Sequence, residues 1–109
     1  MNNNVVVATG GFDPIHSGHI AYLEEASKLG AILIVGVNSD QWLTRKKGYP
    51  FMPATERQAI VKALKCVDHT VMFDDSDGSA IQAIHNARKL YPNAKIIFSN
   101  GGDRKIHNI

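Results

Sequence analysis

Two histidines and three glycines occur together in residues 10–19, Gly-Gly-Phe-Asp-Pro-Ile-His-Ser-Gly-His. His16 and His19 are three positions apart, so on the first turn of a helix their imidazoles would share roughly one face. The glycine pair at the start lets the backbone approach a ligand or adopt a positive φ, and Gly18 leaves space at the helix start. A helix amino terminus offers unpaired N–H groups and partial positive charge to an anion. The stretch therefore predicts a site that stabilises charge on a phosphoryl group.

The flanking segments place this stretch between a strand and a helix. Residues 5–9 form a continuous apolar run that is typical of a buried strand, and residues 17–29 carry apolar side chains at helical spacing. Gly30 is expected to end that helix as its carboxyl-terminal cap. Residues 31–37 form a second apolar run, as in a parallel strand that is buried on both faces. Turns of this kind are where open parallel sheets bind ligands.

The rest of the chain alternates in the same way. The pattern predicts a loop or broken helix over 41–53, a helix over 53–67, a strand over 70–73, a helix over 81–90 and a strand over 95–99. Expected helix caps are a Thr55–Gln58 capping box and, for the later helix, Asp77 or Ser79. We therefore expect one α/β domain over 1–109, a doubly wound parallel sheet with strand order 3-2-1-4. The turns after the first and fourth strands would then face each other across one crevice.

Composition and charge narrow the class of protein. The chain has 109 residues, 44% hydrophobic and 20% charged, which suits a single globular domain. A formal net charge of +2 does not favour a nucleic-acid partner. No apolar run approaches the roughly 18 residues of a membrane span, so no membrane partner is expected. Cys66 is the only cysteine, and its surroundings predict a packed structural thiol in a reducing, cytoplasmic compartment.

An acidic run at residues 74–77 holds three aspartates in four positions. Such a run could bind a hard cation. It lacks the glycine and glutamate of a calcium-binding loop, so a solvated loop with a helix cap is the favoured interpretation. We predict no metal-ligand site in the protein itself.

Residues 10–19 and their flanking elements resemble the signature of the nucleotidyltransferase superfamily, which includes cytidylyltransferases and ADP-heptose-type adenylyltransferases. That signature is a strand followed by Gly-x-Phe-Asp-x-x-His-x-Gly-His. The positions that match it are Gly10 or Gly11, Phe12, Asp13, His16, Gly18 and His19. The resemblance implies a Rossmann-like fold and transfer of AMP or CMP from a nucleoside triphosphate to a sugar or alditol phosphate, with release of pyrophosphate. It also implies Mg²⁺, held mainly by phosphate oxygens and water.

The resemblance gives roles to the signature residues. His16 and His19 would contact the triphosphate and stabilise the reacting phosphorus as catalytic residues. Gly10, Gly11 and Phe12 would form the floor of the site, with backbone N–H groups near the α-phosphate. For Asp13 two roles stay open: it reaches the metal–phosphate region, or it serves only to hold the turn.

Basic residues outside the signature also match the family. Lys46 or Lys47 corresponds to a basic residue that holds the phosphate of the second substrate, although either could be a solvated lysine. Arg57, in the pair Glu56-Arg57, would direct its guanidinium at phosphate oxygens. An ion pair with Glu56 or another acidic neighbour is the alternative for Arg57.

The segment Gly101, Gly102, Asp103 and Arg104 resembles the family loop that contacts the base and ribose. Its sequence is closer to the ADP-heptose-type members than to glycerol-phosphate cytidylyltransferases, which favours ATP over CTP. The family pattern continues beyond this loop to a further strand and helix, whereas the chain stops at Ile109. We therefore expect the closing element to be lacking or supplied by a second copy, and a homodimer is compatible with the resemblance. The alternative function is a catalytically incomplete nucleotide-binding module of a larger assembly.

Overall fold

The structure, a computed structural model, describes residues 4–99 and 106–108 of the chain. Its strands are β1 (Asn4–Gly10), β2 (Ile32–Val37), β3 (His69–Met72), β4 (Lys95–Ser99) and β5 (Ile106–Asn108). Its helices are α1 (Ser17–Ser27), α2 (Asp40–Lys47), α3 (Ala54–Lys62) and α4 (Ile81–Leu90). The strands form one sheet in the order β3-β2-β1-β4-β5. The predicted order 3-2-1-4 is therefore confirmed.

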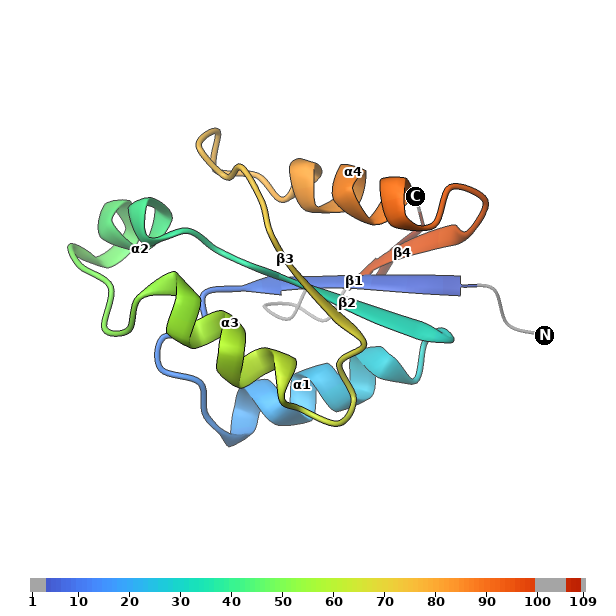
Figure 1. The fold of residues 1–109 in the computed structure, drawn as a ribbon, viewed down its shortest axis with the longest axis horizontal. Helices are drawn as coiled ribbons and strands as arrows, with labels where there is room; N and C mark the ends of the chain where they lie inside the picture. The colour runs from blue at the N-terminus through green and yellow to red at the C-terminus, as the bar shows by residue number, and fades with distance from the viewer. Residues whose placement is uncertain (1–3, 100–105, 109) are drawn as a thin grey trace.

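The sheet lies between two helical layers (Figure 1). Helices α1 and α3 cover one face, where Val6 and Val35 pack against Leu23 and Val61. Helix α4 covers the other face, where Val7 and its neighbours pack against the small side chains of that helix. Successive residues of a strand point to opposite faces, so a strand covered on both faces needs an unbroken apolar run. This is why the runs at 5–9 and 31–37 predicted strands correctly.

Strand β5 was not predicted. It runs antiparallel to β4, with Phe98 opposite His107. Its sequence, Ile-His-Asn, has neither an apolar run nor a clear alternation, and three residues are too few to show a period. The fifth strand therefore depends on pairing with β4 and not on its own side-chain pattern.

Residues 41–53 contain a regular helix that we predicted only as a loop or broken helix. Helix α2 begins after Ser39, whose Oγ accepts a hydrogen bond from the Trp42 amide at 3.0 Å. It ends at Gly48, whose φ of 95° lies in the left-handed region that glycine tolerates. Three cationic side chains occupy its last turn, where they interact favourably with the negative end of the helix dipole. The residues at its two ends identify α2 better than its mostly polar sequence does, because only Leu43 is buried.

Several expected helix ends were wrong. Helix α3 stops at Lys62, not at residue 67, and Pro53 precedes it without a side-chain cap from Thr55. Helix α4 begins after Ala80, which makes no side-chain cap, although the expected capping residue Ser79 accepts the Ile81 amide through its hydroxyl at 3.4 Å. Gly30 is not a left-handed cap of α1. A Cβ at that position would lie 2.6 Å from the Asn4 carbonyl oxygen, so Gly30 is needed because the backbone of β1 passes close to it.

Cys66 lies half-buried against the core, and burial raises the pKa of its thiol, as expected of a packed side chain. In the acidic run, Asp74 and Asp77 are exposed, and each accepts a hydrogen bond from a backbone N–H two residues ahead. Asp75 is instead buried, so the prediction of a solvated loop was wrong for this residue. Among residues 4–99, no three His, Cys, Asp or Glu side chains converge as metal ligands would, and no helix is long and apolar enough to cross a membrane.

Candidate active site

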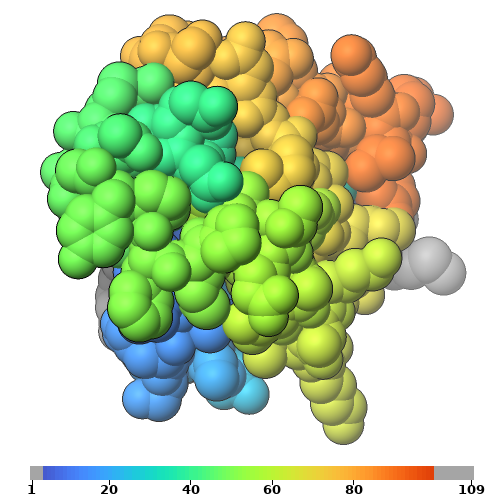
Figure 2. Space-filling model, turned by 60° about the vertical axis from the view of Figure 1, so that its left-hand side comes forward, coloured from blue at the N-terminus to red at the C-terminus, as the bar shows by residue number. Residues whose placement is uncertain are grey.

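The turn between β1 and α1 lies at the carboxyl ends of the parallel strands. Figure 2 shows the molecule with this end turned toward the reader. The residue with a positive φ in this turn is Phe12, at 51°. We had expected that a glycine of the pair Gly10-Gly11 could adopt this conformation. Phe12 is 2% exposed, and its ring meets the His19 imidazole edge-on with 5.3 Å between centroids. Phe12 therefore forms a floor beneath the histidines, and its packing holds an unfavourable backbone conformation in place.

His16 and His19 cap the start of α1 together. The Nδ1 atom of His16 accepts a hydrogen bond from the Gly18 amide at 3.0 Å, and the Nδ1 atom of His19 accepts one from the His16 amide at 3.1 Å. A Cβ on Gly18 would lie 2.9 Å from the His16 ring, so a larger residue would disturb the cap. The two rings are tilted by 30° with their centroids 4.0 Å apart. The prediction that the two imidazoles share a face is confirmed.

This capping decides which nitrogen of each imidazole is available. Because Nδ1 accepts an N–H in both residues, a neutral ring carries its proton on Nε2. Burial lowers the pKa of His19, and the neighbouring His16 lowers it further, so the neutral form is favoured. Each ring therefore has an Nε2–H donor, beside a helix amino terminus with partial positive charge. Together they suit an anion such as a phosphate group.

Asp13 fixes the loop at residues 48–53 to the turn after β1. Its carboxylate accepts hydrogen bonds from the Phe51 and Met52 amides, the second at 2.6 Å. The Lys47 ammonium lies 2.8 Å from an Asp13 carboxylate oxygen and 2.8 Å from the Asp13 carbonyl oxygen. Burial by itself would raise the pKa of Asp13, but these hydrogen bonds outweigh it and hold the pKa below its usual value. The structure therefore shows Asp13 holding the turn and the loop.

The two lysines that the sequence left open lie in different places. Lys47 reaches Asp13, whereas the Lys46 ammonium lies over the Trp42 ring, 4.7 Å from its centroid. A Cβ on Gly11 would lie 3.7 Å from the Trp42 indole, so this pair also borders the turn. Lys47 has one N–H beyond the two that bind Asp13, and its side chain is 36% exposed. Lys47 is thus the lysine that contacts the signature turn directly.

Arg57 is fully buried. Its guanidinium donates to the carbonyl oxygens of Gly11 at 2.9 Å, Asn38 at 2.7 Å and Met52 at 2.9 Å, and forms an ion pair with Asp40 at 2.7 Å. These bonds join the ends of β1 and β2, the start of α2 and the loop before α3. In this structure Arg57 does not present a free fork to a ligand, and its acidic partner is Asp40, not Glu56.

The other predicted site residues are placed only in part. Gly10 ends β1, and its carbonyl accepts the Asn38 amide at 3.0 Å. Strand β4 lies beside β1, with Ser99 opposite Ala8, so the last described residue of β4 lies beside the carboxyl end of β1. Gly101, Gly102, Asp103 and Arg104 lie outside the described residues.

We predicted no site role for three residues at this edge of the sheet. Trp42 orients Lys46, Asp40 pairs with Arg57, and Asp75 is buried at the start of α2. Asp40 and Asp75 follow shortly after β2 and β3, and this was a usable signal because the carboxyl ends of parallel strands meet at one edge of a sheet.

The fold and this turn define an α/β protein with two capped histidines at the switch point of an open, mainly parallel sheet. The sequence profile described as cytidylyltransferase-like matches residues 7–105, and the chain belongs to that nucleotidyltransferase family.

Named relatives agree with this assignment. The bifunctional protein HldE of Citrifermentans bemidjiense is 47% identical over 107 residues, 96% of this chain and 20% of the relative. An FAD synthase of Methanocella paludicola is 47% identical over 72 residues, 66% of this chain and 51% of the relative. This chain therefore spans about a fifth and about half of the two relatives. A crystal structure of the lipopolysaccharide core biosynthesis protein from Thermoplasma volcanium is similar with a TM-score of 0.69 and 33% identity, over 77% of this chain and 67% of that one.

Proposed function

We propose that this protein transfers a nucleotidyl group from a nucleoside triphosphate to a phosphorylated small molecule. A phosphate oxygen of the second substrate attacks the α-phosphorus, the bond to the bridging oxygen of the β-phosphate breaks, and pyrophosphate leaves with that electron pair. A phosphate monoester is already ionised near neutral pH, so the attacking oxygen needs no general base. The task of the site is to bring two polyanions together in line and to stabilise developing charge.

The observation that carries this proposal is the pair of capped histidines. Their Nδ1 atoms are engaged with the backbone, so both imidazoles offer Nε2–H at the start of α1. Donors fixed before the substrate arrives lose little by reorganisation as charge develops on the α-phosphate. His16 and His19 are therefore proposed as catalytic residues on the triphosphate, and Lys47 and Lys46 as the cations nearest the second phosphate.

Mg²⁺ would arrive with the triphosphate. The carboxylate of Asp13 is already engaged with two amides and with Lys47, and its side chain is 1% exposed. The residues present therefore fit an ion that is held by phosphate oxygens and water and not by the turn itself. Its chemistry would be to neutralise charge on the phosphates.

We propose ATP as the nucleotide and a sugar or alditol phosphate as the second substrate. FAD contains an adenylyl group, so the relative named FAD synthase supports adenylyl transfer. The similar structure is named for lipopolysaccharide core biosynthesis, and that core is built of sugars, which supports a sugar phosphate.

The test is pyrophosphate release by the chain with Mg²⁺ and either ATP or CTP, against a panel of sugar and alditol phosphates and riboflavin 5′-phosphate, with products identified by mass spectrometry. We expect release with ATP and a sugar or alditol phosphate, and its loss in His16→Ala. His85→Ala, which changes an exposed histidine on α4, is the matched control and should retain the rate. Nucleotide binding without release under every condition would instead favour the binding-module alternative.

A further inference from the structure

Asp75 is the aspartate of the acidic run that does not face solvent. It is 3% exposed, and its carboxylate accepts three hydrogen bonds. The donors are the Ser39 hydroxyl at 2.6 Å, the Ser39 amide at 2.8 Å and the Asn38 side-chain amide at 3.0 Å. The hydrogen bonds outweigh the burial that would raise the pKa of Asp75 and hold it below its usual value, so the group is charged at neutral pH.

The residues that Asp75 holds are the start of α2. Ser39 is the residue before the helix, and its hydroxyl both donates to Asp75 and accepts the Trp42 amide. Asn38 lies between the end of β2 and Ser39. On the other side, Arg57 binds the Asn38 carbonyl and the Asp40 carboxylate. The first turn of α2 is therefore fixed between one buried anion and one buried cation.

The far end of α2 carries the lysines of the site. Lys47 reaches Asp13 in the signature turn, and Lys46 lies over Trp42. A helix of eight residues is about 12 Å long, so a small rotation at its first turn moves its last turn by ångströms. Arg45, in the last turn of the same helix, donates to the Asp75 carbonyl at 3.0 Å, which ties that turn to the same residue.

We propose that Asp75 is a positioning residue, which orients α2 so that its lysines form the subsite for the phosphate of the second substrate. The inference rests on the proposed function. It predicts that loss of the Asp75 carboxylate weakens binding of the second phosphate and leaves the triphosphate, which the histidines bind, almost unaffected.

Two probes separate the subsites. The first is α,β-methylene-ATP with Mg²⁺, in which the bond to be broken is replaced, and its binding is measured by calorimetry. The second is inorganic phosphate, titrated into protein saturated with that analogue. We expect Asp75→Asn to weaken phosphate binding about tenfold, since it removes charge-assisted hydrogen bonds that order the helix. Binding of the analogue should change by less than about twofold.

The chain offers two matched controls. Asp74→Asn changes the exposed neighbour in the same loop. Asp68→Asn removes a carboxylate that accepts the Leu33 amide at 2.8 Å at the opposite end of β2, so it tests loss of a backbone-binding carboxylate alone. Both should leave both affinities close to those of the unchanged protein.

Trp42 supplies a readout that a general loss of stability would not change. It is the only tryptophan, and its amide is bonded to the Ser39 hydroxyl that Asp75 holds. We expect acrylamide to quench its fluorescence more strongly in Asp75→Asn than in Asp68→Asn under folded conditions. Ser39→Ala removes one of the three bonds and should shift phosphate affinity and quenching in the same direction by less, which keeps the inference testable if Asp75→Asn does not fold.

Equal effects of Asp75→Asn on the analogue and on phosphate would overturn the inference, as would equal effects of Asp75→Asn and Asp68→Asn. So would absence of phosphate binding to the analogue-loaded protein. Failure of the unchanged protein to bind the analogue is a different result, because it contradicts the proposed function itself.

Discussion

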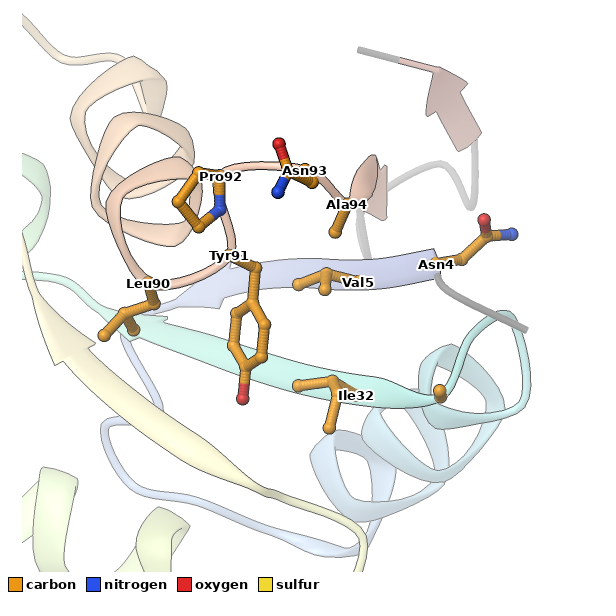
Figure 3. A pocket seen from close by; sticks show the side chains of 9 residues that line it. Asn4, Val5, Ile32, Leu90, Tyr91, Pro92, Asn93 and Ala94 are labelled. Atoms are coloured by element: carbon orange, nitrogen blue, oxygen red, sulfur yellow. The ribbon is translucent and has the colours of Figure 1, made fainter. Parts of the chain in front are cut away.

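The two ends of the sheet differ in what their side chains do. At the amino end, a cavity of about 440 Å³ is lined mainly by apolar groups, among them Val5, Ile32, Leu90 and Tyr91 (Figure 3). At the carboxyl end lie the buried polar residues of the described chain: Asn38, Arg57, Asp75 and Ser99.

Every buried side-chain nitrogen and oxygen in the described chain has a hydrogen-bond partner. Burial of polar groups is costly unless they are paired, and a fully paired network makes a region rigid. The paired polar residues therefore fix the geometry of the carboxyl end. The amino end thus has an apolar hollow, whereas the carboxyl end gathers paired polar side chains.

The largest effect is expected at the histidines. His16→Ala and His19→Ala each remove an oriented Nε2–H donor, so turnover should fall by about 100- to 1,000-fold. The turn carries both residues at the surface of the fold, so both variants should remain folded by circular dichroism. Unchanged turnover in both variants would contradict the proposal that the histidines at the carboxyl ends of the strands are catalytic.

Substitution of one buried arginine at the carboxyl end and one arginine at the amino end compares the two ends directly. Arg57→Leu leaves three carbonyl groups and Asp40 without their donor, so the free energy of unfolding should fall by about 3 kcal/mol and activity should fall with it. Arg88 at the amino end likewise donates to main-chain carbonyls, of Pro92 at 3.0 Å and Ala94 at 2.6 Å. Arg88→Leu should cost about 1 kcal/mol in urea unfolding and leave the rate of the folded protein unchanged. Equal losses of activity would remove the distinction.

The lysines of α2 should differ by a smaller factor. Lys47→Ala removes the ammonium that contacts the signature turn and should weaken phosphate binding about tenfold, as loss of one charge-assisted hydrogen bond does. Lys46→Ala, on Trp42, should have the smaller effect. Calorimetric titration of both variants checks the order, and the reverse order would make Lys46 the phosphate ligand.

Acidification should loosen the carboxyl end. Burial lowers the pKa of His19 below its ordinary value of 6.5, so at mildly acidic pH the unfolded chain binds more protons than the folded one. The stability that the neutral ring contributes is complete above pH 6.5 and is lost as the pH falls through the lower folded pKa. Unfolding free energies measured across that range should decline more steeply for the unchanged protein than for His19→Gln. Parallel curves would exclude this role.

The smallest effect is expected at the cavity of the amino end. Leu90 is 52% exposed, so Leu90→Ser should change the free energy of unfolding by no more than about 0.5 kcal/mol. Pyrophosphate release should not change measurably. A marked loss of activity would show that this cavity takes part in the reaction.

The amino-acid sequence by itself determined the existence of strands β1 to β4, the turn after β1 and the pairing of His16 with His19, whereas the strand order was expected with the support of the family resemblance. These features depend on contacts between residues close in the chain, such as the bonds from the Gly18 and His16 amides, or on long apolar runs. Local patterns are visible in a sequence because the interacting residues have fixed spacing.

Only the tertiary structure decided the roles of Arg57, Asp75 and the two lysines. Arg57 binds a carbonyl 46 positions away, and Asp75 binds an amide 37 positions away. A charged residue in a loop or helix start has the same sequence pattern whether it faces solvent, a phosphate or a buried carbonyl. Its role follows from which strand ends the sheet brings together, because burial and the available partners are properties of the assembled sheet.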